Sequence, residues 1–346
     1  MQNVKNNLRA YTSNPSEYLH FYNTNYENNY PNYQLHIVKE RKKAIDYQRA
    51  SWLYSWDQFI LGKQWTTRND FYTVAKLHVD SNIHNIKIKL FGLNKDHIID
   101  PWRWSFRVKT KKFINEIGNT KFNLLTPKTR GYLTDIMCNN IFKELNLIYL
   151  NYKPINLSIN DSKSDIYFIE DHFSKYIIER SKRRDSYLFT INQVKHPKDL
   201  NELDINRINS IKKLMSSNPE NIFDYDKFYS YLALTYLSQE THSSLSGNLH
   251  YYYNPVSNKI EPIIRETEFN KELNNLQSFG DLYSDIKNFF NNNINSYSDE
   301  HQSLLRSIIQ NESKLNLQTM RVLEVNSKIS QLLKTFPLVV LEFQMK

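Results

Sequence analysis

Residues 223–269 constrain the fold most, because they join a helical pattern, a polar loop and a hairpin pattern. One helical face is marked by Phe228, Tyr231, Leu232, Thr235 and Tyr236. Asp224 stands where an N-cap is expected. Beyond the polar loop, two strand-like runs at 249–253 and 260–264 flank the turn signal Asn254-Pro255. The stretch therefore predicts a helix, a loop and a β-hairpin.

Polar side chains follow one another through this stretch in the order Glu240, Asn248 and Glu266. Phosphoryl transfer from ATP uses a carboxylate near the acceptor hydroxyl, and oxygen ligands that hold the metal ions on the phosphates. These three residues supply those groups. The alternative interpretation is that they are ordinary polar residues at the turns of a helix–loop–hairpin.

The length and charge of the chain limit its class. Its 346 residues allow one large domain or two lobes. A net charge of +9 favours anionic partners such as a nucleotide, a nucleic acid or an anionic membrane face, although a basic surface alone would explain it. The single cysteine, Cys138, excludes a disulfide framework within the chain. We see neither a secretory signal nor a spanning segment, which predicts a cytoplasmic protein without a transmembrane segment.

Alternating patterns predict strands at 71–78, 86–92 and 104–112, which would form a small twisted antiparallel sheet with a wet, basic face. Further strands are predicted at 154–159 and 165–169. Helical patterns are predicted at 37–61, 172–181 and 203–215, and from Thr126 onward.

The basic strand carries the cations Arg103, Arg107 and Lys109, which on one face would meet phosphate groups. The alternative is a solvated strand that is protected by its charge. Glu170 and Asp171 end a later strand, where a carboxylate could orient a phosphate-binding cation. Asp171 would equally suit a helix N-cap. We expect one of the three cations to face Glu170 or Asp171.

Four segments, in this order, resemble the spore-coat protein H (CotH) kinase family over about residues 33–269. They are IKIKLFGLNKDHI (86–98), RWSFRVK (103–109), the run from TPKTRGYL to IERSKRR (126–184) and ETHSSLSGNLHYYYNPVSNKIEP (240–262). The resemblance implies an α+β, two-lobed, atypical protein-kinase-like fold, with a small antiparallel sheet lobe at about 35–125 and a larger mixed helical lobe at about 126–300. An Asn- and Tyr-rich arm at 1–34 and a helical tail at 301–346 would flank this domain.

The resemblance also implies ATP- and Mg²⁺-dependent phosphoryl transfer to a hydroxyl on a protein or another acceptor. Glu240 falls on the family's catalytic aspartate, Asn248 on its metal-binding asparagine and Glu266 on its metal-binding aspartate. Arg103 falls on the nucleotide-binding lysine, and Asp171 on the glutamate that pairs with that lysine.

At four of those positions, Glu240, Glu266, Asp171 and Arg103, the residue differs from the family's residue but keeps the sign of its charge. One methylene moves a carboxylate by about 1 Å, and a misplacement of that size slows phosphoryl transfer strongly, because transfer depends on positioning. The alternative prediction is therefore a catalytically inactive pseudokinase that serves as a binding or assembly module, for example in envelope or coat construction. A basic nucleic-acid binder is a third interpretation, and it rests on charge alone.

Overall fold

A computed structural model describes residues 30–61, 71–92, 95–130, 139, 141–197, 199–238 and 248–265, and the single positions 288, 291, 292, 302 and 306. The chain forms two compact units. The first comprises Met1–Tyr132 and Asn151–His172, and the second comprises Leu133–Leu150 and Phe173–Lys346.

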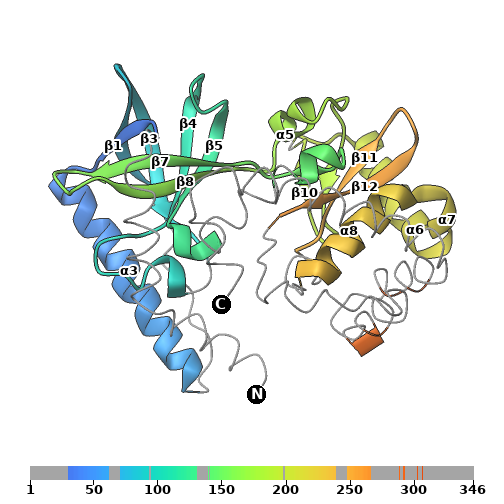
Figure 1. The fold of residues 1–346 in the computed structure, drawn as a ribbon, viewed down its shortest axis with the longest axis horizontal. Coiled ribbons are helices and arrows are strands. Elements are labelled where there is room, and N and C mark those ends of the chain that lie inside the picture. The colour runs from blue at the N-terminus through green and yellow to red at the C-terminus, as the bar shows by residue number, and fades with distance from the viewer. Residues whose placement is uncertain are drawn as a thin grey trace, which may run out of the picture. The chain divides into compact units, whose positions relative to one another are not determined.

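The first unit contains a closed barrel of seven strands in the order β1-β2-β3-β4-β5-β8-β7 (Figure 1). Neighbouring strands are antiparallel, except that β1 pairs in parallel with β7 and so closes the barrel. The strands are β1 (Asn32–His36), β2 (Thr73–Val79), β3 (Asn82–Leu90), β4 (Phe106–Ile114), β5 (Asn119–Leu125), β7 (Tyr152–Ile159) and β8 (Asp165–Asp171).

Alternation of apolar and polar residues along the strands gives the barrel its two faces. In β3, Ile86, Ile88 and Leu90 are buried, while Lys87 is exposed and Lys89 is half-buried. The buried set belongs to one hydrophobic cluster with side chains from the other barrel strands, among them Leu35, Leu77, Val108, Phe122, Leu157 and Tyr167. The barrel interior is therefore a packed apolar core, and the lysines of β3 lie on its outer face.

Helix α3 (Lys39–Ile60) packs against β2 and β3 through a buried stripe that includes Ile45, Trp52 and Trp56. Arg49 extends from this helix to donate a hydrogen bond from Nε to the carbonyl oxygen of Ile98 at 2.8 Å. Its guanidinium also lies 5.3 Å from the ring centroid of Trp104, a cation–π contact. The helix thus holds the segment that leads into β4.

The second unit contains a five-stranded sheet in the order β10-β9-β11-β12-β6, with helices in the same unit (Figure 1). The strands are β6 (Ile148–Tyr149), β9 (Leu188–Phe189), β10 (Val194–His196), β11 (His250–Asn254) and β12 (Lys259–Ile264). The helices are α5 (Lys175–Arg180), α6 (Glu202–Ser217), α7 (Pro219–Ile222) and α8 (Tyr225–Ser238). In the described part of the chain, no helix combines the length and the apolar character needed to cross a membrane.

The predicted helix and hairpin of residues 223–264 are confirmed as α8, β11 and β12. Tyr251 and Tyr253 are buried in one cluster with Phe228, as the apolar patterns of the helix and hairpin favour. The sheet and this helix therefore share a core.

The predicted two-lobed kinase-like fold is wrong. The strands expected to form a small open sheet belong to the closed barrel, and the strands at 154–159 and 165–169 complete that barrel as β7 and β8 instead of joining a helical lobe. The prediction failed because local patterns do not show how the barrel closes. Alternation identifies single strands, whereas the parallel pairing of β1 with β7 joins residues more than a hundred positions apart.

Candidate functional site

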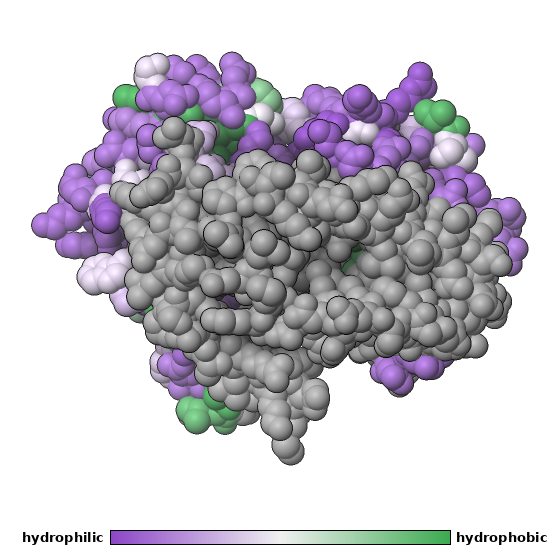
Figure 2. Space-filling model, in the orientation of Figure 1, coloured by the Kyte–Doolittle hydropathy of each residue, from purple (hydrophilic) through white to green (hydrophobic). Residues whose placement is uncertain are grey.

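The outer face of four consecutive barrel strands is strongly basic. Strands β2 to β5 carry eight Lys and Arg residues and no Asp or Glu. The eight are Lys76, Lys87, Lys89, Arg107, Lys109, Lys111, Lys112 and Lys121. Figure 2 shows hydrophilic residues gathered over the hairpin ends of the barrel strands, with a few hydrophobic residues among them.

Five of these cations form two rows across the sheet, which we call the cation ladder: Lys87, Lys89, Arg107, Lys109 and Lys121. Lys109 lies directly opposite Lys87 on one side and Lys121 on the other. Arg107 lies opposite Lys89 in the neighbouring row. Like charges at directly opposed positions destabilise a sheet, so folding alone does not favour this arrangement.

Aromatic rings hold several ladder cations in place. The ammonium groups of Lys89 and Lys109 lie 5.2 and 4.7 Å from the ring centroid of Tyr72. The guanidinium of Arg107 lies 4.7 Å from the ring centroid of Phe91. Such cation–π contacts stabilise a cation without neutralising its charge. The rings therefore fix the side chains and leave the face positive.

Beyond Arg107, the same row continues across β5 and β8 with two buried polar residues, Asn123 and Glu170. Arg107 donates from Nε to the Oδ1 atom of Asn123 at 3.2 Å, and Asn123 lies opposite Glu170 in the next strand. The carboxylate of Glu170 forms an ion pair with Arg130 at 2.9 Å, and both side chains are about 95% buried, with 5% and 3% exposed for Arg130 and Glu170. The acid nearest the ladder in this row is thus already bonded to a cation.

The Glu170–Arg130 pair was not expected from the sequence. Glu170 binds Arg130 of the short 3₁₀ helix η2 (Pro127–Arg130). That Arg103, Arg107 or Lys109 faces Glu170 or Asp171 stays a prediction. Removal of one partner from a buried ion pair costs about 3–5 kcal/mol, because the other charge is left buried. The pair therefore fixes η2 against β8.

Arg103 lies before β4 and binds two carboxylates. Its guanidinium is 2.7 Å from Asp100 and 3.2 Å from Asp165 at the start of β8. Burial raises the pKa of Asp165, and the Arg103 charge opposes this shift. The contacts shown for Arg103 thus tie the loop before β4 to β8. Arg107 and Lys109 do share the outer face, as we predicted for cations of the basic strand.

Asp171 is buried at the end of β8 and exchanges hydrogen bonds with Asn151. The backbone N–H of Asn151 donates to the Asp171 carboxylate at 3.2 Å, and the Asp171 N–H donates to the Asn151 carbonyl at 3.1 Å. Asp171 does not begin a helix, because Ser174 holds the N-cap position of α5.

The predicted catalytic and metal-binding residues belong to the second unit's segment of the chain. Asn248 precedes β11, and its carbonyl oxygen lies 2.6 Å from Nδ1 of His250. Glu240 and Glu266 lie outside the described residues. In the described part of the chain, no group of three or more His, Cys, Asp or Glu side chains is arranged to hold a metal ion.

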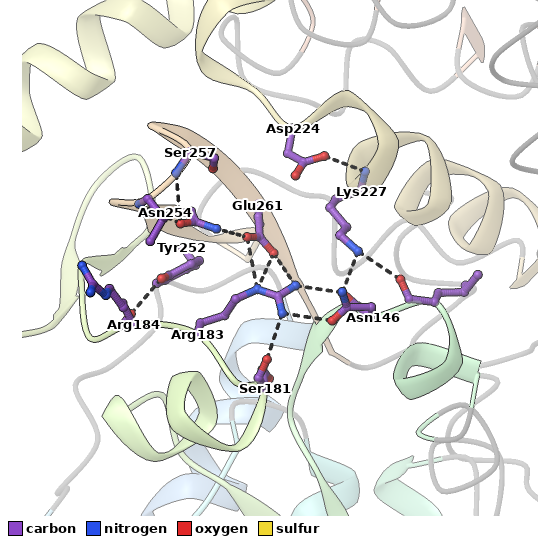
Figure 3. A network of polar contacts seen from close by, with 12 residues as sticks. Asn146, Ser181, Arg183, Arg184, Asp224, Lys227, Tyr252, Asn254, Ser257 and Glu261 are labelled. Carbon is purple, nitrogen blue, oxygen red and sulfur yellow. Dashed lines mark hydrogen bonds and ion pairs between the residues drawn. The ribbon is translucent and has the colours of Figure 1, made fainter.

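Arg183 of the basic run 180–184 serves the fold of the second unit. Arg183 donates from Nε to both carboxylate oxygens of Glu261, at 3.2 Å to Oε1 and 3.1 Å to Oε2, and from Nη2 to Oε2 at 2.9 Å (Figure 3). It also donates from Nη1 to the Oδ1 atom of Asn146 at 2.9 Å, and Lys227 reaches the Asn146 carbonyl at 2.8 Å. Asn254 donates to Glu261 from the hairpin turn. This network ties β12, α8 and two loops of the second unit together.

Sequence reasoning missed part of the basic face. It placed Lys87 and Lys89 on the basic face and named Arg107 and Lys109 as site residues, but it did not predict the strand of Lys121. The absence of acidic residues from the three strands predicted at 71–78, 86–92 and 104–112 was a readable signal. Asn123 and Arg130 could not be found in this way, because their roles depend on the cross-strand register.

Sequence comparisons add no family assignment: no protein-family model and no curated protein matches the chain. The resemblance to CotH kinases therefore stays a prediction.

Proposed function

We propose that the barrel unit binds a ligand with several phosphate groups on the outer face of β3–β5. The observation that carries the proposal is the alignment of Lys87, Lys109 and Lys121 at directly opposed positions. A polyanion across these strands would relieve their mutual repulsion, and lysine binds phosphate as a point charge. ATP is the ligand of this class that the sequence resemblance implies, so it is the first probe.

Two finer predictions build on this binding face. Mg²⁺-dependent phosphoryl transfer from ATP would require Glu240, Asn248 and Glu266, which would supply an acid–base carboxylate and hard oxygen ligands. A catalytically inactive binding or assembly module would require phosphate binding alone. Both stay predictions, as does a cytoplasmic location, and an assay of phosphate transfer to a hydroxyl acceptor separates the first two.

The test is a calorimetric titration of ATP without metal into three proteins: the wild type, the variant Lys109→Gln/Lys121→Gln and the control Lys153→Gln/Lys163→Gln. The control removes the same charge from exposed positions of the same unit. We expect the ladder variant to bind about 10–100-fold more weakly, since each lost charged contact contributes about a factor of ten. The control should change affinity less than about threefold. Equal weakening in both variants, or no binding to the wild type, would refute the proposal.

A further inference from the structure

We infer that the cation ladder recognises a short linear chain of phosphates and not the nucleoside attached to it. This inference rests on the proposed function and goes further, because it names the part of the ligand that is bound. Free inorganic oligophosphate and the tail of a nucleoside triphosphate share this chemistry.

The shape of the ladder favours a short, linear anion. Lys87, Lys109 and Lys121 occupy three adjacent strands. Because neighbouring strands are about 4.8 Å apart, the row spans roughly 10 Å. Lys89 and Arg107 form a parallel row about 7 Å away along the strands. An anionic chain that lies across the strands therefore meets several cations at once.

Both ends of the rows limit the length of the bound chain. On the β2 side, Val74 lies opposite Lys87 and offers no charge. On the β8 side, Asn123 is followed by Glu170, whose carboxylate is bonded to Arg130. The row of Lys87 thus has no cation on β2, and the row of Arg107 has none beyond β4, so the rows match a few phosphates better than a long polymer.

The rings beside the ladder argue against recognition by base stacking. Proteins that bind single-stranded nucleic acid combine cations with aromatic rings on which bases stack. Here Tyr72 already carries Lys89 and Lys109 on its ring, and Phe91 carries Arg107. A base stacked on those faces would displace the cations that attract the phosphates.

Arg107 is a ladder donor that is held from two sides. Asn123 accepts from its Nε atom at 3.2 Å, and Phe91 lies under its guanidinium. Asn123 itself is buried, with 3% of its surface exposed. A donor fixed from two sides loses little conformational freedom when a ligand binds. Arg107 would therefore mark one fixed end of the phosphate chain.

The experiment is a titration series at constant ionic strength, without metal, using phosphate, pyrophosphate, tripolyphosphate, ATP, adenosine and a thymidine oligonucleotide of the same charge as tripolyphosphate. We expect affinity to rise about tenfold with each added phosphate up to tripolyphosphate. ATP should bind within about threefold of tripolyphosphate, and adenosine should not bind. Tyr72→Leu should weaken ATP and tripolyphosphate by the same factor.

The outcomes separate this inference from the function on which it rests. If adenosine binds, if ATP binds more than tenfold tighter than tripolyphosphate, or if Tyr72→Leu weakens ATP alone, the nucleoside is recognised; the inference fails and phosphate binding stands. If the oligonucleotide binds more tightly than tripolyphosphate, the ligand is a nucleic acid and the inference also fails. If none of the anions binds, the proposed function itself is wrong.

Discussion

Gly92 shows how one residue shapes the edge of the candidate site. It follows Phe91, whose ring lies beneath Arg107. Its φ is +89°, a backbone angle that residues other than glycine rarely adopt. A Cβ atom at this position would collide with the ring of His97. Gly118 also has a positive φ, +78°, but a Cβ atom there would meet open space. The two glycines therefore share a backbone cost and differ in steric cost.

We predict that Gly92→Ala lowers the free energy of unfolding more than Gly118→Ala does. Gly118→Ala should cost about 1–2 kcal/mol from the left-handed backbone alone. Gly92→Ala should cost at least about 1 kcal/mol more, because the ring of His97 must move. Urea denaturation of both variants measures the difference. Equal losses would mean that the close approach of His97 to Gly92 is absent in solution.

Asp224, before α8, gives a prediction about pH. Burial is the main cause that raises its pKa, and the charge of Glu261 adds to this, while the hydrogen bond from the Lys227 N–H opposes it. The folded state therefore holds the proton more tightly than the unfolded chain. The stabilisation that this bound proton provides is lost as the pH rises from the pKa of the unfolded state, about 3.9, through the raised pKa of the folded state.

The substitution Asp224→Asn should raise the free energy of unfolding at pH 7, because asparagine keeps an acceptor for the cap and removes the half-buried charge. The gain should shrink as the pH falls toward 4. Asp226→Asn is the control, and it should lower stability at pH 7 by about 0.3–1 kcal/mol through loss of a charge near the helix N-terminus. A gain for Asp224→Asn that does not vary with pH would contradict the argument.

At the scale of the element, β1 determines whether the barrel closes. Tyr33 and Leu35 of this short strand are buried inside, and the strand pairs with both β2 and β7. We predict that Leu35→Ala costs about 2–5 kcal/mol, as large-to-small changes in a core do. Gln34→Ala, on the exposed face of the same strand, should stay within about 0.5 kcal/mol. If thermal unfolding shows a similar, small loss of stability for Leu35→Ala and Gln34→Ala, β1 does not close the barrel in solution.

Some strands and helices could be predicted from the sequence and others could not. Alternation in residues 86–92 and 104–112 located β3 and β4, and helical spacing located α3 and α8, because these signals are local. The strand at Asn119–Leu125 was missed, since asparagine, which it contains twice, is depleted in strands. Asn123 acquires its role only through pairing with β4 and β8. The site prediction likewise found Arg107 and Lys109 but could not reveal which cations face them.

At the scale of the whole molecule, each unit has a core of its own and a different use for its cations. In the second unit, Arg183 is bonded to Glu261, and its charge serves the fold. In the barrel unit, the ladder places cation beside cation across β3–β5. The net charge of +9 does not show this difference in how the two units arrange their cations. The claim at this scale is that the opposed set binds phosphate.

The salt dependence of ATP affinity tests that claim most directly. The logarithm of the binding constant should fall linearly with the logarithm of salt concentration, with a slope set by the number of cations that contact phosphate. We predict a clearly shallower slope for Lys87→Gln/Lys109→Gln/Lys121→Gln than for the wild type. The control Lys43→Gln/Lys153→Gln/Lys163→Gln, with the same net charge, should keep the wild-type slope. A wild-type slope in the ladder variant would contradict the account.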